Sequence, residues 1–243
     1  RRIILNKTEE LQRIIAGRDK LYSVIAHDLR SPMGSIKMVL NMLMLNLPVE
    51  KIGAEMYELL TMANRTTEDV FSLLDNLLKW TKSQIGNLNV VYQDVDAVEV
   101  VDSVIDVFNM VAGLKKITIR EEKPEKLPVC TDIDMLKTII RNLLSNAIKF
   151  SNENSEVLVK MEEQGDTVVV SVKDSGCGID EEGQQKLLHT DTHFSTFGTN
   201  NEEGSGLGLL LCQDFAVKIG GKLWFTSKEG EGSTFYFSIP LKK

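Results

Sequence analysis

The sequence lacks any long apolar run: no stretch reaches 18 consecutive apolar residues, and the most hydrophobic segment, residues 38–47, is interrupted by asparagine. A transmembrane helix needs about 20 apolar residues, so the sequence predicts no membrane span. It also lacks an excess of basic residues. Its formal net charge of −7 argues against a general nucleic-acid surface, which needs clustered Lys and Arg. Any phosphate must therefore be bound at a local site.

Cysteine is scarce as well. Cys130, Cys177 and Cys212 lie far apart and form no C-x-x-C pair, which fits neither a zinc site nor a disulfide framework and indicates isolated thiols in a reducing compartment. With 42% hydrophobic and 26% charged residues among 243, the composition is that of an ordinary globular protein, and we expect two domains. Because the sequence begins RRIILNK, without an initiator Met or a signal peptide, we also expect a piece of a longer protein.

The first part of the chain has helical periodicity. Apolar residues recur every three or four positions over residues 8–46 and again over residues 50–82, with Pro48 between the two patterns. Residues 1–85 are therefore predicted to form an all-α helical hairpin. Two helices cannot cover a continuous apolar stripe for each other, so we expect a homodimer that completes a four-helix bundle. The stripe of the first helix consists of Leu21, Ile25, Leu29, Ile36, Leu40 and Leu43.

A polar segment at residues 83–89, which contains Gly86, is predicted to link the hairpin to a second domain at residues 86–243. Helical and strand patterns interleave there without a repeating βαβ unit, which favours an α+β two-layer sandwich. Strands are expected at residues 90–95, 117–121, 128–131, 157–161, 167–173, 222–227 and 233–239. Helices are expected at residues 96–112, 132–150, 207–218 and briefly after Asp180.

His27 lies on the first predicted helix. At about 100° per residue it falls about 190° from the centre of the apolar stripe, so we expect it to face solvent. A lone histidine there is usually an ordinary surface residue, but its neighbours favour chemistry. Asp28 can accept a proton from one imidazole nitrogen and make the other more nucleophilic, and Arg30 supplies a positive charge suited to a phosphoryl group. Pro32 removes a backbone donor and should bend the helix.

The segment IAHDLRSPMGSI, residues 25–36, resembles the phosphoacceptor motif of sensor histidine kinases. The resemblance implies that His27 is the phosphorylated residue and that Asp28 is its acid/base partner. The segment departs from the family at Ser31, where Thr or Asn often orients water for dephosphorylation, which leaves phosphatase activity open.

A second motif, RNLLSNAIKFS at residues 141–151, carries Asn142, Asn146 and Lys149 on one helix face because their spacings are four and three. Such a face is as often merely solvated. An amide oxygen is nevertheless an acceptable Mg²⁺ ligand, and a lysine can pair with phosphate. The run resembles the asparagine-containing motif of the same family, which implies Asn146 as the metal ligand and the other two residues as phosphate contacts.

Asp174, Gly176 and Gly178 come directly after a predicted strand. The pattern alone is typical of an ordinary turn, but a carboxylate there can accept a hydrogen bond from the exocyclic amine of adenine. The glycines would let the base approach the backbone. The resemblance implies this adenine contact for Asp174.

The last motif opens a predicted helix, whose free N–H groups and dipole favour phosphate, although the run also fits a flexible hinge. Its residues are Gly204, Ser205, Gly206, Leu207 and Gly208. The preceding loop has the length and composition of a mobile lid, in which Ser195, Thr196 and Thr199 are candidate nucleotide contacts.

The order of these motifs is that of the ATP-binding fold shared by histidine kinases, type II topoisomerases, mismatch-repair ATPases and a heat-shock chaperone; only the His27 motif favours kinases among them. The resemblance covers about residues 15–240. It implies a kinase that uses ATP and Mg²⁺ to phosphorylate His27 and passes the phosphoryl group to an aspartate of a response-regulator receiver domain. It also implies a cytoplasmic segment, without membrane contact of its own, whose full-length protein can be a membrane receptor.

Two rival functions stay open. One is a degenerate kinase that serves as a dimeric signalling scaffold. The other is an ATPase clamp, like the topoisomerase relatives, that uses hydrolysis to change conformation.

Overall fold

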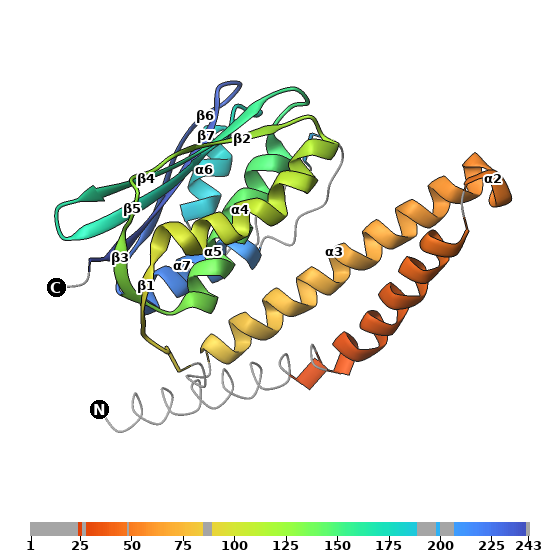
Figure 1. The fold of residues 1–243 in the computed structure, drawn as a ribbon, viewed down its shortest axis with the longest axis horizontal. Helices are drawn as coiled ribbons and strands as arrows, with labels where there is room; N and C mark the ends of the chain where they lie inside the picture. The colour runs from red at the N-terminus through yellow and green to blue at the C-terminus, as the bar shows by residue number, and fades with distance from the viewer. Residues whose placement is uncertain are drawn as a thin grey trace, which may run out of the picture. The chain divides into compact units, whose positions relative to one another are not determined.

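The structure of the chain is a computed structural model (Figure 1). The chain divides into two compact units, residues 1–89 and 90–243. The sequence prediction places this division between residues 85 and 86. The residues that the structure describes are 24–25, 28–47, 49–84, 89–188, 198–199 and 207–241.

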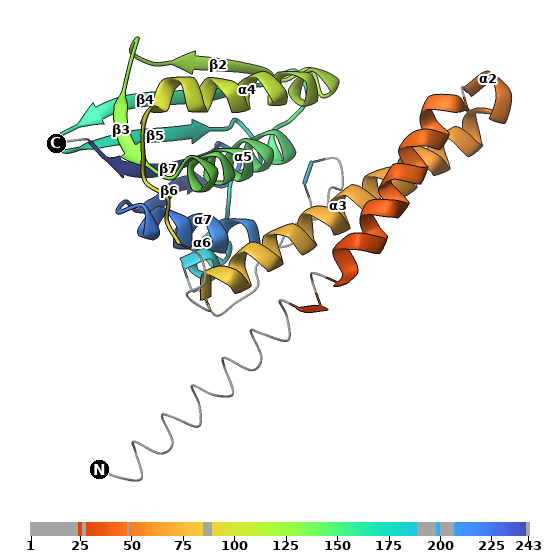
Figure 2. The ribbon, with the colours of Figure 1, turned by 60° about the horizontal axis from the view of Figure 1, so that its bottom comes forward.

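The first unit contains a helical hairpin. A helix at residues 28–46 lies beside the long helix α3, Ala54–Gln84, and the short helix α2, Val49–Ile52, precedes α3 (Figure 2). The first predicted helix is thus confirmed over the part of it that the structure describes. The predicted bend at Pro32 stays a prediction.

The prediction of one continuous helix over residues 50–82 is wrong. Gly53 has a φ of 80°, in the left-handed region, and this ends α2. The next helix then begins, and the Tyr57 N–H donates to the Gly53 carbonyl at 3.1 Å. A single glycine therefore divides one predicted helix into two.

Within the hairpin the two long helices touch through a small apolar cluster. Leu74 and Leu78 of α3 are buried, and Met33, Val70 and Leu77 pack against them. The contact therefore uses Met33, which is not a member of the predicted apolar stripe.

Charged side chains also join the two helices. Arg30 forms an ion pair with Asp75, and its guanidinium carbon lies 6.0 Å from the centroid of the Phe71 ring. Lys79 pairs with the same carboxylate at 3.0 Å. Arg30, whose positive charge we predicted to act on a phosphoryl group beside His27, is thus paired with a residue of α3.

Much of the predicted apolar stripe is left uncovered by this contact. The exposed apolar residues of the hairpin include Ile25, Leu29, Ile36, Leu43, Met56, Leu59 and Met62. One chain alone therefore presents an apolar surface that burial in an assembly would stabilise.

The second unit is built on a five-stranded sheet with the order β2-β4-β5-β7-β6. Strand β2 pairs parallel with β4, and the other pairs are antiparallel. A separate two-stranded sheet pairs β1 with β3. The strands are β1 Gln93–Asp96, β2 Thr118–Glu122, β3 Pro128–Thr131, β4 Glu156–Gln164, β5 Thr167–Lys173, β6 Leu223–Lys228 and β7 Gly232–Pro240.

Helices α4, α5 and α7 lie along one face of the sheet in both views (Figures 1 and 2). The core lies between these layers, where Leu144 of α5, Val170 of β5 and Phe237 of β7 are fully buried. No described helix combines the length and hydropathy of a membrane span. The helices of this unit are α4 Ala97–Leu114, α5 Ile133–Phe150, α6 Glu181–Leu188 and α7 Leu207–Lys218.

This architecture confirms the predicted α+β domain, with its strands and helices in the expected order. The predicted strand at residues 90–95 is shifted, since Gln93–Asp96 are the residues that pair with β3. Strand β4 extends beyond its predicted end to Gln164, where a tight turn with Gly165 at a φ of 63° leads into β5. The Thr167 hydroxyl donates to the Gln164 carbonyl at 3.0 Å and closes this turn.

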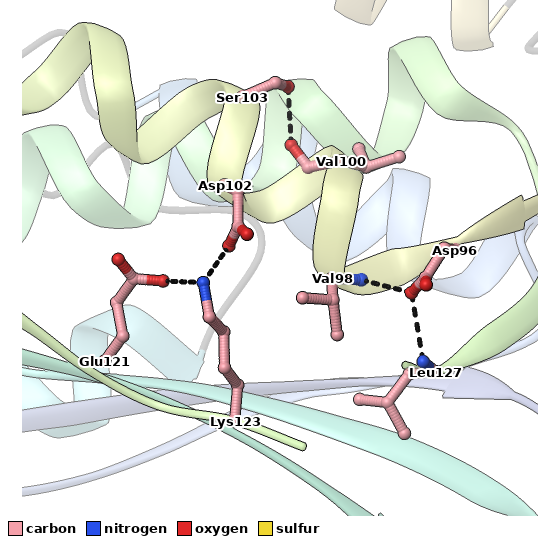
Figure 3. Close-up of polar contacts among 8 residues, drawn as sticks. All are labelled: Asp96, Val98, Val100, Asp102, Ser103, Glu121, Lys123 and Leu127. Atoms are coloured by element: carbon pink, nitrogen blue, oxygen red, sulfur yellow. Dashed lines mark hydrogen bonds and ion pairs between the residues drawn. The ribbon is translucent and has the colours of Figure 1, made fainter. Parts of the chain in front are cut away.

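Two acidic residues, Asp96 and Asp102, hold α4 in place (Figure 3). Asp96 is the N-cap, and its Oδ1 accepts hydrogen bonds from the N–H groups of Val98 and Leu127, both at 3.0 Å. Further along the helix, Asp102 forms an ion pair with Lys123. These contacts tie α4 to the segment that connects β2 with β3.

We expect Asp96→Ala to lower the free energy of unfolding by about 1–2 kcal/mol, because two backbone N–H groups lose their acceptor. Urea denaturation of the two proteins measures this difference. Asp106→Ala, at an exposed position of the same helix, is the matched control and should change stability by less than about 0.5 kcal/mol. Equal effects of the two substitutions would contradict the capping role.

Candidate functional site

Helix α5 carries the predicted asparagine motif. Asp132 caps its N-terminus, because its Oδ1 accepts hydrogen bonds from the N–H groups of Asp134 and Met135, both at 3.0 Å. Leu143 and Leu144 are buried, as the sequence predicts for the face toward the sheet. The half-buried polar residues of the opposite face are Asn142, Asn146 and Lys149.

The side chain of Asn142 reaches the first turn of α7. Its Nδ2 donates to the Thr138 carbonyl at 2.9 Å. Its Oδ1 lies only 2.6 Å from where a Cβ would stand at Gly208, so a larger residue at that position would collide with the amide. Leu207, the residue before, is buried. The structure thus brings the asparagine motif into contact with the last glycine of the Gly-x-Gly-x-Gly motif.

Asp174 directly follows β5 and is only 4% exposed. Its Oδ1 accepts hydrogen bonds from the N–H of Gly176 at 2.9 Å and from the N–H of Ser233 at 3.1 Å. Burial raises the pKa of Asp174, and these hydrogen bonds lessen the rise without cancelling it. Both bonds end on Oδ1, so Oδ2 can accept a hydrogen bond from a ligand.

The loop after Asp174 is held by close backbone contacts. A Cβ at Gly176 would come within 2.1 Å of the carbonyl oxygen of Phe150, at the end of α5. A Cβ at Gly178 would come within 1.9 Å of the Lys228 carbonyl oxygen, and the φ of Gly178 is 65°. No side chain fits at either position. The glycines therefore seat the Asp174 loop on α5 and on the end of β6.

The C-terminal turn of α5 carries contacts that the sequence does not predict. The Lys149 Nζ lies 4.7 Å from the centroid of the Phe150 ring. The side chain of Lys115, from the end of α4, is buried and donates to the carbonyl groups of Ile148 and Lys149. Lys115 stands beside a second lysine between a helix and a strand, where a lysine is usually solvated. Its sequence context therefore gives no signal of this role.

The remaining predicted site residues fall into three groups: one lies in the first unit, one contacts the end of α5, and the others lie outside the described residues. Asp28 is exposed and belongs to the first unit, whereas α5 belongs to the second. Thr199, a lid candidate, donates its N–H to the Lys149 carbonyl at 3.2 Å. The predicted residues that lie outside the described ranges are His27, Ser195, Thr196, Gly204 and Gly206.

The surroundings of α5 fit an adenine nucleotide. Asp174 offers a buried acceptor, and Gly176 and Gly178 hold its loop against the ends of α5 and β6. Lys149 provides positive charge for phosphate, and the N-terminus of α7 carries the positive end of the helix dipole. Asn146 provides an amide oxygen, which Mg²⁺ accepts as a ligand. In the described part of the chain, no three His, Cys, Asp or Glu residues gather as a metal cluster.

Comparison with known proteins identifies relatives of the whole chain and of its second unit. Residues 131–243 match the family described as histidine kinase-, DNA gyrase B-, and HSP90-like ATPase. The adaptive-response sensory kinase SasA of Prochlorococcus marinus is 30% identical, over 98% of this chain and 61% of that protein. The chain thus spans about three fifths of the length of the SasA relatives it matches.

Solved structures of similar fold come from the same group of proteins. The catalytic domain of the histidine kinase ThkA is 30% identical with a TM-score of 0.54, over 62% of this chain and 96% of that domain. Full-length ShkA, solved in complex with AMPPNP, has a TM-score of 0.67 over 92% of this chain and 46% of that chain. At 22% identity, the likeness to ShkA shows the fold alone.

We expect Asp174→Asn to unfold at a higher temperature than the wild type at neutral pH without nucleotide. Burial raises the pKa of the carboxyl group, so the folded protein holds its proton more tightly than the unfolded chain does, and the ionised form opposes folding. The amide oxygen of Asn can still accept both N–H groups.

The difference in melting temperature should shrink as the pH falls through the raised pKa, because the protonated wild type then carries no buried charge. Calorimetric scans from pH 7 down to about pH 4 follow this change. A difference that stays constant over the whole range would contradict the assignment.

Proposed function

We propose that this chain, which carries the catalytic ATPase domain of the sensor histidine kinases and belongs to that family, uses ATP and Mg²⁺ to phosphorylate its own His27. The observation that carries the proposal is the junction at α5. There the loop of Asp174 and the first turn of α7 both meet a helix whose polar face bears Asn146 and Lys149.

Asp174 is assigned to adenine. With Oδ1 held by two backbone N–H groups, Oδ2 is suited to one ligand donor, and the exocyclic amine of adenine is such a donor. Guanine would present a carbonyl oxygen to the carboxylate at the same place. A buried polar group left without a partner costs about 1–3 kcal/mol, so the site should favour ATP over GTP. Gly176 and Gly178 shape the loop that the base approaches.

The triphosphate is assigned to the polar face of α5 and to the start of α7. Lys149 and Asn142 contact phosphate oxygens, and the N–H groups at the start of α7 add the positive end of the helix dipole. Asn146 would hold Mg²⁺, which would supply charge neutralisation for the transferring group. The glycine motif that contributes backbone to the phosphates consists of Gly204, Gly206, Leu207 and Gly208.

The transfer step joins the two units. An imidazole nitrogen of His27 attacks the γ-phosphorus in line, a P–N bond forms, the bond to the bridging oxygen breaks, and ADP leaves. Asp28 accepts the proton of the other imidazole nitrogen. The nucleotide residues and His27 belong to different units, so each transfer requires both units. Arg30 pairs with Asp75, and its other N–H groups can donate to the phosphoryl group.

The phosphorylated histidine then donates its phosphoryl group to an aspartate of a response-regulator receiver domain in two-component signalling. Similarity to proteins named sensory kinases supports this step. We also propose a homodimer, in which two hairpins complete a four-helix bundle. The exposed apolar residues of the hairpin support the dimer, since pairing would bury them. This catalytic portion is proposed to act in the cytoplasm, including as part of a membrane-anchored receptor.

We expect the wild-type chain, incubated with Mg²⁺ and ATP tagged at the γ-phosphate, to gain an acid-labile label. His27→Gln should lose all of it because the acceptor nitrogen is gone. Asn146→Ala should label roughly 100-fold more slowly, because the charge on the phosphates is no longer neutralised in place. Asn109→Ala, an exposed asparagine of α4, is the matched control and should label normally.

The same experiment separates the rival functions. A chain that binds Mg²⁺ and ATP yet gains no label would favour the signalling scaffold. Steady release of phosphate that His27→Gln leaves unchanged would favour the ATPase clamp.

For the dimer, we expect the double substitution Ile36→Glu and Leu43→Glu to give monomers. Both side chains are exposed in the single chain, and a carboxylate buried between two hairpins would have no partner. Size-exclusion chromatography with light scattering gives the mass. Val217→Glu, which replaces an exposed apolar residue of α7, should stay dimeric. A double variant with the mass of the wild-type dimer would refute this interface.

A further inference from the structure

Lys115 is a buried lysine that sequence patterns do not single out. It is the C-cap residue of α4 and only 7% exposed. Its Nζ donates to the Ile148 carbonyl at 3.1 Å, to the Lys149 carbonyl at 2.9 Å and to the Thr199 hydroxyl at 2.6 Å. Lysine is rarely buried unless its charge is satisfied, and here three oxygens surround the ammonium group.

The position of this charge suits the end of α5. The last carbonyl groups of a helix have no partner within it, and they carry the negative end of the helix dipole. The ammonium group of Lys115 lies at this end of the helix and donates to two such carbonyl groups at once. The C-terminal turn of α5 is therefore held from a different helix, α4.

Thr199 completes the arrangement. Its N–H donates to the Lys149 carbonyl at 3.2 Å. Its Oγ1 lies 2.8 Å from the Ser151 carbonyl oxygen and 3.1 Å from that of Lys149, while it accepts from Lys115. A hydroxyl has one proton to give, so it donates to one of these carbonyls at a time. Lys115 and Thr199 thus bracket the turn that ends α5.

This turn carries functional groups of the nucleotide site. Lys149 lies in this turn, and Asn146 lies two residues before Ile148, whose carbonyl is the first that Lys115 holds. A change in the turn would therefore move the proposed phosphate and metal contacts.

We propose that Lys115 is a positioning residue of the nucleotide site: it fixes the C-terminal turn of α5 so that Lys149 meets the phosphates of the nucleotide. The inference rests on the proposed function. The competing explanation is that Lys115 only caps a helix and stabilises the fold. The two differ in which part of a nucleotide is bound less tightly when the ammonium group is removed.

The test compares the whole chain with Lys115→Met, which keeps most of the apolar stem and removes the charge. Isothermal or fluorescence titration measures the dissociation constants of ATP with Mg²⁺ and of adenosine, which has the base and no phosphates. We expect the dissociation constant of ATP to rise about tenfold, as for the loss of one charge-assisted contact, and that of adenosine to change less than about twofold. Lys116→Met, the exposed neighbour, is the control and should change neither.

A double-mutant cycle tests whether Lys115 acts through Lys149. If it does, Lys115→Met should weaken ATP binding little further in the Lys149→Met background. Full additivity of the two losses would overturn the inference. So would unchanged binding of ATP by Lys115→Met, or an equal loss for ATP and adenosine, which is the result expected of a merely structural cap.

Thr199→Val keeps the inference testable if Lys115→Met does not fold. It removes the hydroxyl that Lys115 contacts at an exposed residue, and we expect a rise of about threefold in the dissociation constant of ATP and none for adenosine. No change with Thr199→Val would then overturn the inference. A wild-type chain that does not bind ATP would instead defeat the proposed function, so the two failures are distinguishable.

Discussion

The backbone of Gly176 lies against the carbonyl group of Phe150 so closely that a Cβ would come within 2.1 Å of its oxygen. This contact joins the loop after β5 to the end of α5, two segments that are distant in the sequence. It fixes where the carboxylate of Asp174 stands relative to the polar face of α5. Lys115 holds the same helix end from α4. The nucleotide site we propose depends on this turn keeping its place.

Two features of the isolated chain are energetically unfavourable. A bound ligand would relieve the first, and a second copy of the chain would relieve the second. The buried carboxyl group of Asp174 has a raised pKa because burial disfavours its charge, and a ligand donor would compensate that cost. The hairpin exposes apolar side chains such as Ile36 and Leu59, and a second hairpin would cover them. The first feature favours a nucleotide and the second favours a dimer.

Much of the second unit could be predicted because its signals are local. Helix α5 begins after the capping residue Asp132 and follows its apolar periodicity, and the bounds of β3, β5 and α7 are those predicted. The break at Gly53 was missed, since a glycine inside a helical pattern does not by itself reveal a positive φ. The role of Lys115 was missed because it depends on tertiary contacts with α5. The contact of Asn142 with Gly208 could not be predicted either, because the separation of two motifs in the sequence does not tell how far apart they lie in the fold.

The most direct test of the central claim is to locate the phosphoryl group. The whole chain is incubated with Mg²⁺ and ATP, digested under neutral conditions that preserve a P–N bond, and mapped by mass spectrometry. Our account predicts one phosphorylated residue, His27, whose modification disappears after acid treatment. Phosphate on another residue that acid does not remove, or hydrolysis of ATP without any phosphorylated peptide, would contradict it.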